Sequence, residues 1–384
     1  MSWSVCPKRS LTWRASERQV REGFRPTWVE VDLEAIRHNA RVLKPESAEL
    51  MAVVKANGYG HGDVEVARAA IEAGATWCGV ALVEEGLRLR SAGIEAPILV
   101  LSELPAGSEA VALAHRLTPT LYSDGGLERL ASATRGSVPV HVKVDTGMHR
   151  VGVWPPEAAP AFAGRVQEAG FEVEGLFTHF ARSEEDEATT KEQLDRFLDA
   201  AEAARTARVR PRVLHAANSG ATILHPQSHL DLVRPGIALY GIEPAPGIGA
   251  HLGLRPALTW RSRVSAVKRL PAGEAVSYGH RYRLEHDAWL ATVPVGYADG
   301  YPRQLTNLGS VLIGGRRYGI AGTVTMDQLL VDCADAEIQV GEEVVLIGNQ
   351  GDETVGADEL GRLIGTIGYE IVSRIGDRVP RRYG

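Results

Sequence analysis

The chain has 384 residues, more than a single hydrophobic core usually holds, so we expect two domains. Hydrophobic residues make up 44% and charged residues 23% of the chain, which is typical of a globular protein and excludes extensive disorder. The formal net charge of -6 gives no indication of a basic face, so nucleic acid and anionic membranes are not expected partners and a small molecule is favoured.

The cysteines and the start of the chain indicate a cytoplasmic protein. Cys6, Cys78 and Cys333 are widely separated and lack the spacing of metal ligands, so we expect reduced thiols and no metal. No segment approaches the ~20 apolar residues of a membrane span, and the first residues carry charges where a signal peptide is apolar. Residues 1–26 show no clean periodicity and are assigned to an N-terminal arm without a function.

From Met51 to Gly241, short apolar runs alternate with amphipathic stretches, a pattern typical of parallel strands with helical crossovers. Eight such units in roughly 190 residues favour a (β/α)8 barrel of the TIM type over an open doubly wound sheet. The predicted strands are 51–54, 77–81, 97–101, 119–122, 138–144, 172–178, 212–214 and 232–234, and the predicted helices include 63–73, 84–91, 125–133 and 185–207.

Beyond Arg255 the chain changes to runs rich in Val, Leu and Thr, separated by turn signals. One of these signals, Gly314-Gly315, predicts a two-residue β-hairpin because both positions tolerate positive φ. We therefore expect an α/β protein with an arm over residues 1–26, a barrel over 27–255 and a C-terminal, mostly β domain over 256–384.

The first predicted barrel strand runs directly into Lys55, in the segment VVKANGYGHG. Catalytic residues of such barrels lie where strands end and loops begin. A lysine amine becomes a good nucleophile when desolvation or a neighbouring cation lowers its pKa from ~10.4, and it then bonds covalently to an aldehyde. An isolated lysine at a strand end is more often an ordinary surface residue, so the surrounding residues decide between the two interpretations.

The segment VVKANGYGHG resembles the pyridoxal 5'-phosphate (PLP) signature of alanine racemases, and the similarity extends from Thr27 to Tyr383. The resemblance implies a barrel followed by a β domain, PLP as cofactor and interconversion of L- and D-alanine. It also implies a homodimer with active sites shared between subunits, and supply of D-alanine for peptidoglycan. The other matching blocks are KVDTGMHRVG (143–152), THFA (178–181), HAANSGA (215–221), VRPGIALYG (233–241), VSYG (276–279), PVGYADGYPR (294–303), TMDQ (325–328) and GYEIVSRIGDRVPR (368–381).

Two loops have the residues that a phosphate group requires. Backbone N–H groups, hydroxyls and small residues that permit close approach bind phosphate well. Such residues follow the seventh strand at Asn218-Ser219-Gly220 and the eighth at Pro235-Gly236-Ile237, where barrel phosphate sites often lie. Taken alone, Ser219 is better explained as a helix cap and Gly236 as a turn residue. The resemblance implies cofactor binding by Lys55, Tyr59, Arg150, His179, Asn218, Ser219, Arg234, Gly236, Ile237 and Tyr369.

The resemblance assigns Arg234 to the pyridine nitrogen of the cofactor. Arginine keeps its protons, so it donates a hydrogen bond and leaves that nitrogen unprotonated. The ring is then a weaker electron sink, which restrains side reactions such as transamination. His179 is implied to connect Arg234 to the catalytic tyrosine, although a lone histidine in THFA is more often a core residue.

Racemisation removes a proton from one face of the α-carbon and delivers one to the other face, which calls for two acid/base groups. The resemblance implies that Lys55 serves the D enantiomer and that Tyr278, contributed by the partner subunit, serves the L enantiomer. A tyrosine of ordinary pKa, near ~10, acts as a base only when cations or a hydrogen-bond chain stabilise its phenolate. Without the resemblance, Tyr278 is interpreted as a strand tyrosine beside a turn.

Two further groups are implied near the substrate. Arg150 binds either the substrate carboxylate or the O3' oxygen of the cofactor. Lys143, which is carbamylated in many family members, orients Arg150. The implied residues of the β domain are Tyr297 in the access corridor, Arg303, and Met326 with Asp327 near the substrate carboxylate and the catalytic tyrosine.

The chain departs from the common family pattern at Thr323 and Thr325, where relatives frequently carry an arginine and a cysteine. We expect altered packing near Met326 and unchanged chemistry.

Other functions stay open at this point. A racemase for serine or a broader set of small amino acids is one alternative, because a single hydroxyl changes selectivity only modestly in a small pocket. A non-catalytic protein of PLP homeostasis would resemble the barrel alone, whereas this chain also has a β domain with Tyr278. A decarboxylase of basic amino acids would need an acidic group at the position of Arg234.

Overall fold

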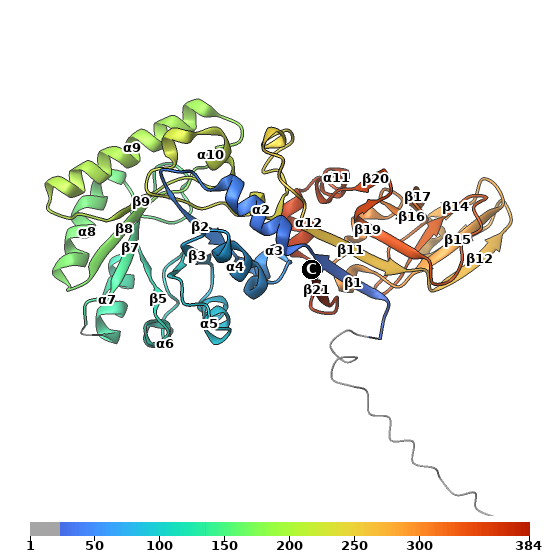
Figure 1. Ribbon diagram of the computed structural model, residues 1–384, viewed down its shortest axis with the longest axis horizontal. Helices are drawn as coiled ribbons and strands as arrows, with labels where there is room; N and C mark the ends of the chain where they lie inside the picture. The colour runs from blue at the N-terminus through green and yellow to red at the C-terminus, as the bar shows by residue number, and fades with distance from the viewer. Residues whose placement is uncertain (1–23, 135) are drawn as a thin grey trace, which may run out of the picture.

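The computed structural model describes residues 24–134 and 136–384. Most of the predicted N-terminal arm, residues 1–23, lies outside the described residues, as does Cys6. The described chain forms a helix-covered barrel and a β-rich domain that lie side by side along the long axis of the molecule (Figure 1).

The eight predicted barrel strands are all present, and the predicted fold class is confirmed. Parallel pairing joins the strands in the orders β10-β2-β3-β4-β5 and β6-β7-β8-β9. The fourth predicted strand, 119–122, is present as β6, and a further short strand, β5, precedes it on the other side of Pro119, which has no N–H to donate. The strands are β2 (Glu49–Val53), β3 (Trp77–Val80), β4 (Ile98–Val100), β5 (Leu117–Thr118), β6 (Thr120–Leu121), β7 (Pro139–Lys143), β8 (Glu172–Phe177), β9 (Val213–His215) and β10 (Leu232–Val233).

Side-chain caps fix where several barrel helices begin. Asp32, Ser123, Asp186 and Asn218 each accept a hydrogen bond from the backbone N–H three residues further on. The helices are α2 (Leu33–Leu43), α3 (Lys55–Tyr59), α4 (Asp63–Glu72), α5 (Val83–Ser91), α6 (Glu109–Ala114), α7 (Asp124–Ala133), α8 (Ala159–Glu168), α9 (Glu187–Thr206) and α10 (Ser219–Leu224), with 3-10 turns η1 (Pro156–Ala158), η2 (Pro226–Ser228), η3 (Ile237–Tyr240) and η4 (Ala250–Leu252).

The second domain is built on a sheet in the order β12-β15-β18-β17-β16-β19-β11-β1-β21. The predicted hairpin at Gly314-Gly315 joins β16 to β17, with φ of 58° and 74°. The elements are β11 (Leu258–Arg263), β12 (Ala266–Leu270), β13 (Ala275–Val276), η5 (Tyr278–His280), β14 (Tyr282–Arg283), β15 (Ala288–Val293), η6 (Tyr297–Asp299), η7 (Arg303–Leu305), β16 (Ser310–Ile313), β17 (Arg316–Ile320), β18 (Leu329–Asp332), β19 (Glu343–Gln350), β20 (Glu353–Val355), α11 (Ala357–Leu363), α12 (Gly368–Ser373) and β21 (Arg381–Tyr383).

Strand β1 (Thr27–Val31) falls within the range predicted for the barrel, 27–255, but lies instead in the sheet of the second domain. It pairs antiparallel with β11, with Val31 opposite Leu258, and parallel with β21 (Figure 1). Its inward-facing residues Val29 and Val31 pack in the core of that domain with Trp260. The alternation of apolar and polar residues along a strand indicates which face is buried but not which sheet the strand joins. The sequence therefore did not indicate that β1 belongs to the second domain.

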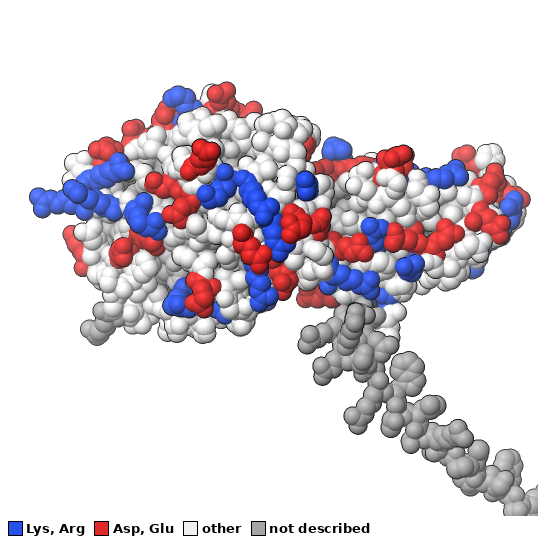
Figure 2. Space-filling view, viewed as in Figure 1, with Lys and Arg blue, Asp and Glu red and all other residues white. Residues whose placement is uncertain are grey.

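Each of the two domains has its own apolar core. One large apolar cluster lies within the barrel domain and another within the second domain. Cys78 and Cys333 are buried free thiols. No helix among the described residues has the length and apolarity needed to cross a membrane. Figure 2 shows acidic and basic side chains interspersed over the visible face of both domains.

Candidate active site

Lys55 lies at the end of the first barrel strand, where the chain enters an unusual turn. The next four residues, 56–59, have φ between 51° and 59°, so α3 is a short left-handed turn. Three of the four are not glycine, and this conformation costs such residues roughly 1–2 kcal/mol each. The turn brings Lys55, Ala56 and Tyr59 to the wall of one cavity. Backbone strain of this kind is typical of functional sites.

Glu85 supports this turn, and the sequence analysis missed it. Its carboxylate is buried and accepts hydrogen bonds from the backbone N–H of Ala56 at 2.7 Å and of Ala81 at 2.8 Å. It therefore ties the turn after β2 to the end of β3. No motif signalled this role, because a glutamate in the first turn of a helix usually serves only the helix itself.

The cavity at the mouth of the barrel has a volume of about 460 Å³. It lies where the strands end, as expected for a barrel of this kind. All ten residues predicted to bind the cofactor line it, together with Lys143. They are Lys55, Tyr59, Arg150, His179, Asn218, Ser219, Arg234, Gly236, Ile237 and Tyr369.

Cations dominate the electrostatics of this cavity. Burial, followed by the charge of Arg150, lowers the pKa of Lys55 below its ordinary value. Burial, Arg150 and Arg234 lower the pKa of Lys143 to about 8. A lower pKa leaves a larger fraction of each lysine amine neutral. The positive charge of Arg150, Arg234 and the protonated fraction of the lysines attracts an anionic ligand.

A cradle suited to phosphate lies on one side of the cavity. The Ser219 hydroxyl accepts hydrogen bonds from the N–H of Gly236 at 2.8 Å and of Ala238 at 3.3 Å. The buried N–H of Ile237 has no partner among residues 24–134 and 136–384. A Cβ at Gly236 would overlap the Tyr59 hydroxyl, so only glycine leaves room for that group. A free N–H, hydroxyls and a glycine that allows close approach fit a bound phosphate.

Arg234 is held in the wall of the same cavity by several hydrogen bonds. Its Nη2 donates to the carbonyl oxygens of Thr178 at 2.7 Å and Ala216 at 3.0 Å. The same Nη2 lies 3.5 Å from Nδ1 of His179, the contact that the resemblance implied. Burial lowers the pKa of Arg234 to about 9, so the guanidinium keeps its charge at neutral pH. A fixed donor of this kind can direct one N–H at a ring nitrogen.

Tyr369 is the one predicted residue of the β domain that lines this cavity, and the others, Tyr278, Tyr297, Arg303, Met326 and Asp327, do not. Tyr278 begins η5 and is 75% exposed, in a surface hollow with Thr323 and Thr325. Thr323 donates a hydrogen bond from its hydroxyl to the carbonyl oxygen of Tyr278 at 2.8 Å.

The remaining predicted residues of this domain lie on its surface. Tyr297 and Met326 are exposed. Asp327 accepts a hydrogen bond from Arg378 at 2.7 Å. Arg303 lines a separate groove with Arg281. One chain thus brings together the predicted cofactor residues but not the second predicted base.

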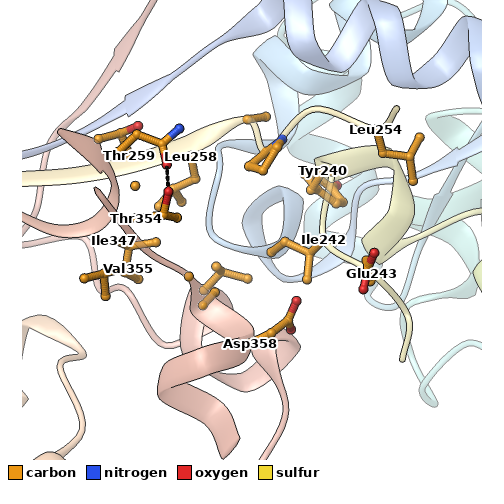
Figure 3. Close-up of a pocket in the computed structure, with 18 of the residues that line it drawn as sticks. Tyr240, Ile242, Glu243, Leu254, Leu258, Thr259, Ile347, Thr354, Val355 and Asp358 are labelled. Atoms are coloured by element: carbon orange, nitrogen blue, oxygen red, sulfur yellow. Dashed lines mark hydrogen bonds between the residues drawn. The ribbon is translucent and has the colours of Figure 1, made fainter. Parts of the chain in front are cut away.

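A second cavity, of about 340 Å³, lies between the two domains (Figure 3). Its walls are largely apolar, with Tyr240, Leu254 and Ile347 among the lining residues. Its charged lining residues are the carboxylates Glu243 and Asp358, and neither lysine nor arginine lines it. Since acidic groups repel phosphate, this cavity does not fit a phosphorylated cofactor.

The first cavity fits one class of cofactor. A lysine with a lowered pKa, a phosphate cradle and a fixed arginine at the mouth of a barrel define a PLP-dependent enzyme. The chain belongs to the alanine racemase family. The family model for the N-terminal domain of alanine racemases matches residues 31–244, and the model for the C-terminal domain matches residues 257–383.

Relatives match almost the whole chain. The alanine racemase of Symbiobacterium thermophilum is 50% identical over 94% of this chain and 98% of its own length. That of Frankia casuarinae is 46% identical over 92% and 95%. The alanine racemase structure from D-cycloserine producing Streptomyces lavendulae superposes with a TM-score of 0.90 at 40% identity, covering 94% of this chain and 98% of that chain. The structure from Bacillus anthracis with bound L-Ala-P gives 0.89 at 38% identity, covering 94% and 96%. The chain is therefore an amino-acid racemase that uses PLP.

Proposed function

We propose that this chain interconverts L- and D-alanine, with Lys55 and Tyr278 as the two bases. The observation that supports the proposal most directly is the convergence of Lys55, the phosphate cradle and Arg234 in one cavity of about 460 Å³. The names of the relatives support alanine as the substrate rather than serine.

The cradle residues hold the cofactor by its phosphate. Tyr59, Ser219 and Tyr369 supply hydroxyls, and Ile237 supplies its unpaired N–H. Asn218 fixes this loop because its side chain caps α10. Arg234 donates to the pyridine nitrogen, with His179 beside it. When bound, PLP draws electrons from the α-carbon of the substrate and so acidifies its proton.

Lys55 acts on one face of the substrate. Its Nζ would hold the cofactor through the aldehyde, and as a free amine it would accept the α-proton of the D enantiomer. Burial and Arg150 favour the neutral amine that both tasks require. Arg150 binds the substrate carboxylate or the cofactor O3', and Lys143, as a carbamate, orients Arg150.

Tyr278 acts on the other face, from the partner subunit of a homodimer. Its exposure of 75%, outside the barrel cavity, supports this arrangement because a base must reach the reacting carbon. In the dimer, Tyr297 lines the access corridor and Arg303 is a supporting residue. Met326 with Asp327 lies near the substrate carboxylate and the catalytic tyrosine. We also propose that the enzyme works in the cytoplasm and supplies D-alanine for peptidoglycan, as the family resemblance implies.

Turnover of L-alanine by Lys55→Ala tests this function. We expect the wild type to convert L-alanine to D-alanine and to show the visible absorbance of lysine-bound cofactor. Lys55→Ala should lose that absorbance and at least about 100-fold in kcat, the scale of a lost acid/base group. Lys191→Ala removes an exposed lysine paired with Asp195 and should behave as wild type. Wild-type turnover by Lys55→Ala, or turnover of serine but not alanine, would contradict the proposal.

A further inference from the structure

Two histidines lie one below the other inside the barrel, beneath Arg234. Barrel interiors are usually filled by branched apolar side chains. Here His215 and His141 are both fully buried, and neither belongs to the cavity wall. A buried polar group costs free energy unless it is hydrogen-bonded, so the contacts of these two rings indicate what they do.

The hydrogen bonds of this pair have only one consistent direction. Arg234 can only donate, so its Nη1 donates to Nδ1 of His215 at 3.0 Å. A neutral His215 then carries its proton on Nε2 and donates to Nδ1 of His141 at 2.8 Å. His141 must therefore carry its own proton on Nε2. Burial lowers the pKa of both histidines, which keeps both rings neutral.

The row of side chains formed by Arg234, His215 and His141 ends near a carboxylate at the opposite rim of the barrel. Nε2 of His141 lies 3.7 Å from Oε2 of Glu174, which is too long for a hydrogen bond but close enough for the carboxylate charge to attract the dipole of an Nε2–H group. The other oxygen of Glu174 accepts from Arg212 at 2.9 Å. Glu174 and Arg212 lie near the starts of β8 and β9, at the end of the barrel away from the cavity.

The neighbouring residues fix both rings in place. His215 stacks on Phe177 with ring centroids 4.7 Å apart. His141 meets Trp77 edge to face at 5.3 Å. A Cβ at Gly175 would lie 2.5 Å from the His141 ring, so glycine makes the space that the imidazole occupies. The barrel therefore holds these imidazoles in one orientation.

We propose that His215, His141 and Glu174 form a one-way hydrogen-bond relay that orients Arg234 and partly offsets its charge from the far rim of the barrel. They are positioning residues that act through Arg234. The inference deepens the proposed function, because it assumes that Arg234 faces the cofactor ring. The negative charge of Glu174 selects the Nε2–H form of His141, which selects the same form of His215 and leaves its Nδ1 free to accept from Arg234.

Neutron crystallography of the cofactor-loaded enzyme tests the direction of the relay. We expect a deuteron on Nε2 of both His141 and His215 and none on Nδ1 of either ring. A deuteron on either Nδ1 would overturn the proposal. The positions of these deuterons do not depend on turnover. A wild type that fails to racemise alanine would therefore refute the proposed function, whereas the relay would still be tested by the deuterons on His141 and His215.

Glu174→Gln tests whether the far carboxylate sets the direction. A glutamine side chain can donate as well as accept a hydrogen bond. Both tautomers of His141 and of His215 then become available, and the hydrogen bond from Arg234 to Nδ1 of His215 is weakened. We expect Nδ1 of His215 to become partly occupied by a deuteron, and kcat to fall about tenfold with little change in KM for alanine, equivalent to ~1.4 kcal/mol in the barrier. Glu172→Gln, on the same strand and exposed, removes the same charge without touching the relay.

Equal kcat values for Glu174→Gln and Glu172→Gln would overturn the proposal, as would an unchanged proton order in Glu174→Gln. His141→Phe provides a second variant, because it keeps a ring beside Trp77 and removes the acceptor for His215. It should also lower kcat more than KM. A loss confined to thermal stability in both variants would show that the residues are merely structural.

Discussion

Lys143 ends β7 with 4% exposure, close to the charges of Arg150, Arg234 and Lys55. When Lys143 is a free amine rather than a carbamate, burial and these cations lower its pKa to about 8, against an ordinary value of 10.5. The unfolded chain therefore binds more protons than the folded chain between these two pH values. Stability contributed by this group is fully present above pH 10.5 and is lost as the pH falls through 8.

Replacing Lys143 by methionine should change how stability depends on pH. We expect the free energy of unfolding of the wild type to rise by about 2–3 kcal/mol relative to Lys143→Met between pH 7 and 10.5, at ~1.4 kcal/mol per pKa unit. Urea unfolding in bicarbonate-free buffer measures the difference. Lys191→Met, at an exposed lysine, is the control and should run parallel to the wild type. Parallel curves for Lys143→Met as well would mean that the amine titrates normally.

The predictability of the site differs among its residues. Lys55, Ser219 and Arg234 were found because each follows a recognisable strand and belongs to a block that resembles a family. Glu85 and His141 were missed because their partners are distant in sequence, and only the folded barrel brings a glutamate to the N–H of Ala56 or a second histidine to His141.

At the scale of elements, α12 packs closely against the turn that follows Lys55. A Cβ at Gly60 would overlap the carbonyl oxygen of Val372 in α12, and Gly60 has a φ of 84°. Arg381 donates to the Gly60 carbonyl oxygen at 3.0 Å. This contact joins the second domain to the barrel mouth, and α12 carries Tyr369 into the cavity.

Gly60→Ala should therefore weaken both the fold and cofactor binding. Gly93→Ala is a matched control, because Gly93 has a φ of 83° and a Cβ there would meet nothing within 4 Å beyond its chain neighbours. Both variants incur the cost of positive φ, about 1 kcal/mol, and only Gly60→Ala adds a steric clash with backbone. We expect Gly60→Ala to lose at least about 1 kcal/mol more in urea unfolding and to bind PLP more weakly in titrations. Equal losses in the two variants would rule out the close contact as the reason for glycine.

Some elements could be predicted from the sequence pattern, and others could not. Strands such as β2 and β7 were predicted because buried runs are bounded by turn residues. The left-handed turn of residues 56–59 was not predicted, because Ala56 and Tyr59 rarely adopt positive φ. Strand β1 was assigned to the wrong domain because its partners, β11 and β21, follow it by more than 200 residues.

At the scale of the whole molecule, the two proposed bases lie on different domains. Lys55 faces the barrel cavity, whereas Tyr278 is exposed on the second domain. The last two elements, α12 and β21, contact the loop at Gly60 and Gly62 and so join the second domain to the barrel mouth. The proposed completion of the site by a second copy of the chain rests on this geometry and on the need for two opposed bases.

Mixing two inactive variants tests the shared site most directly. Lys55→Ala and Tyr278→Phe, each nearly inactive alone, would be co-expressed and the unfractionated mixture of dimers assayed for conversion of L-alanine. Random pairing makes half of the dimers mixed, and each mixed dimer has one intact site, so about one quarter of wild-type activity should return. Activity that stays at the sum of the separate variants would contradict the account, because it would mean that Tyr278 serves the site of its own chain or none.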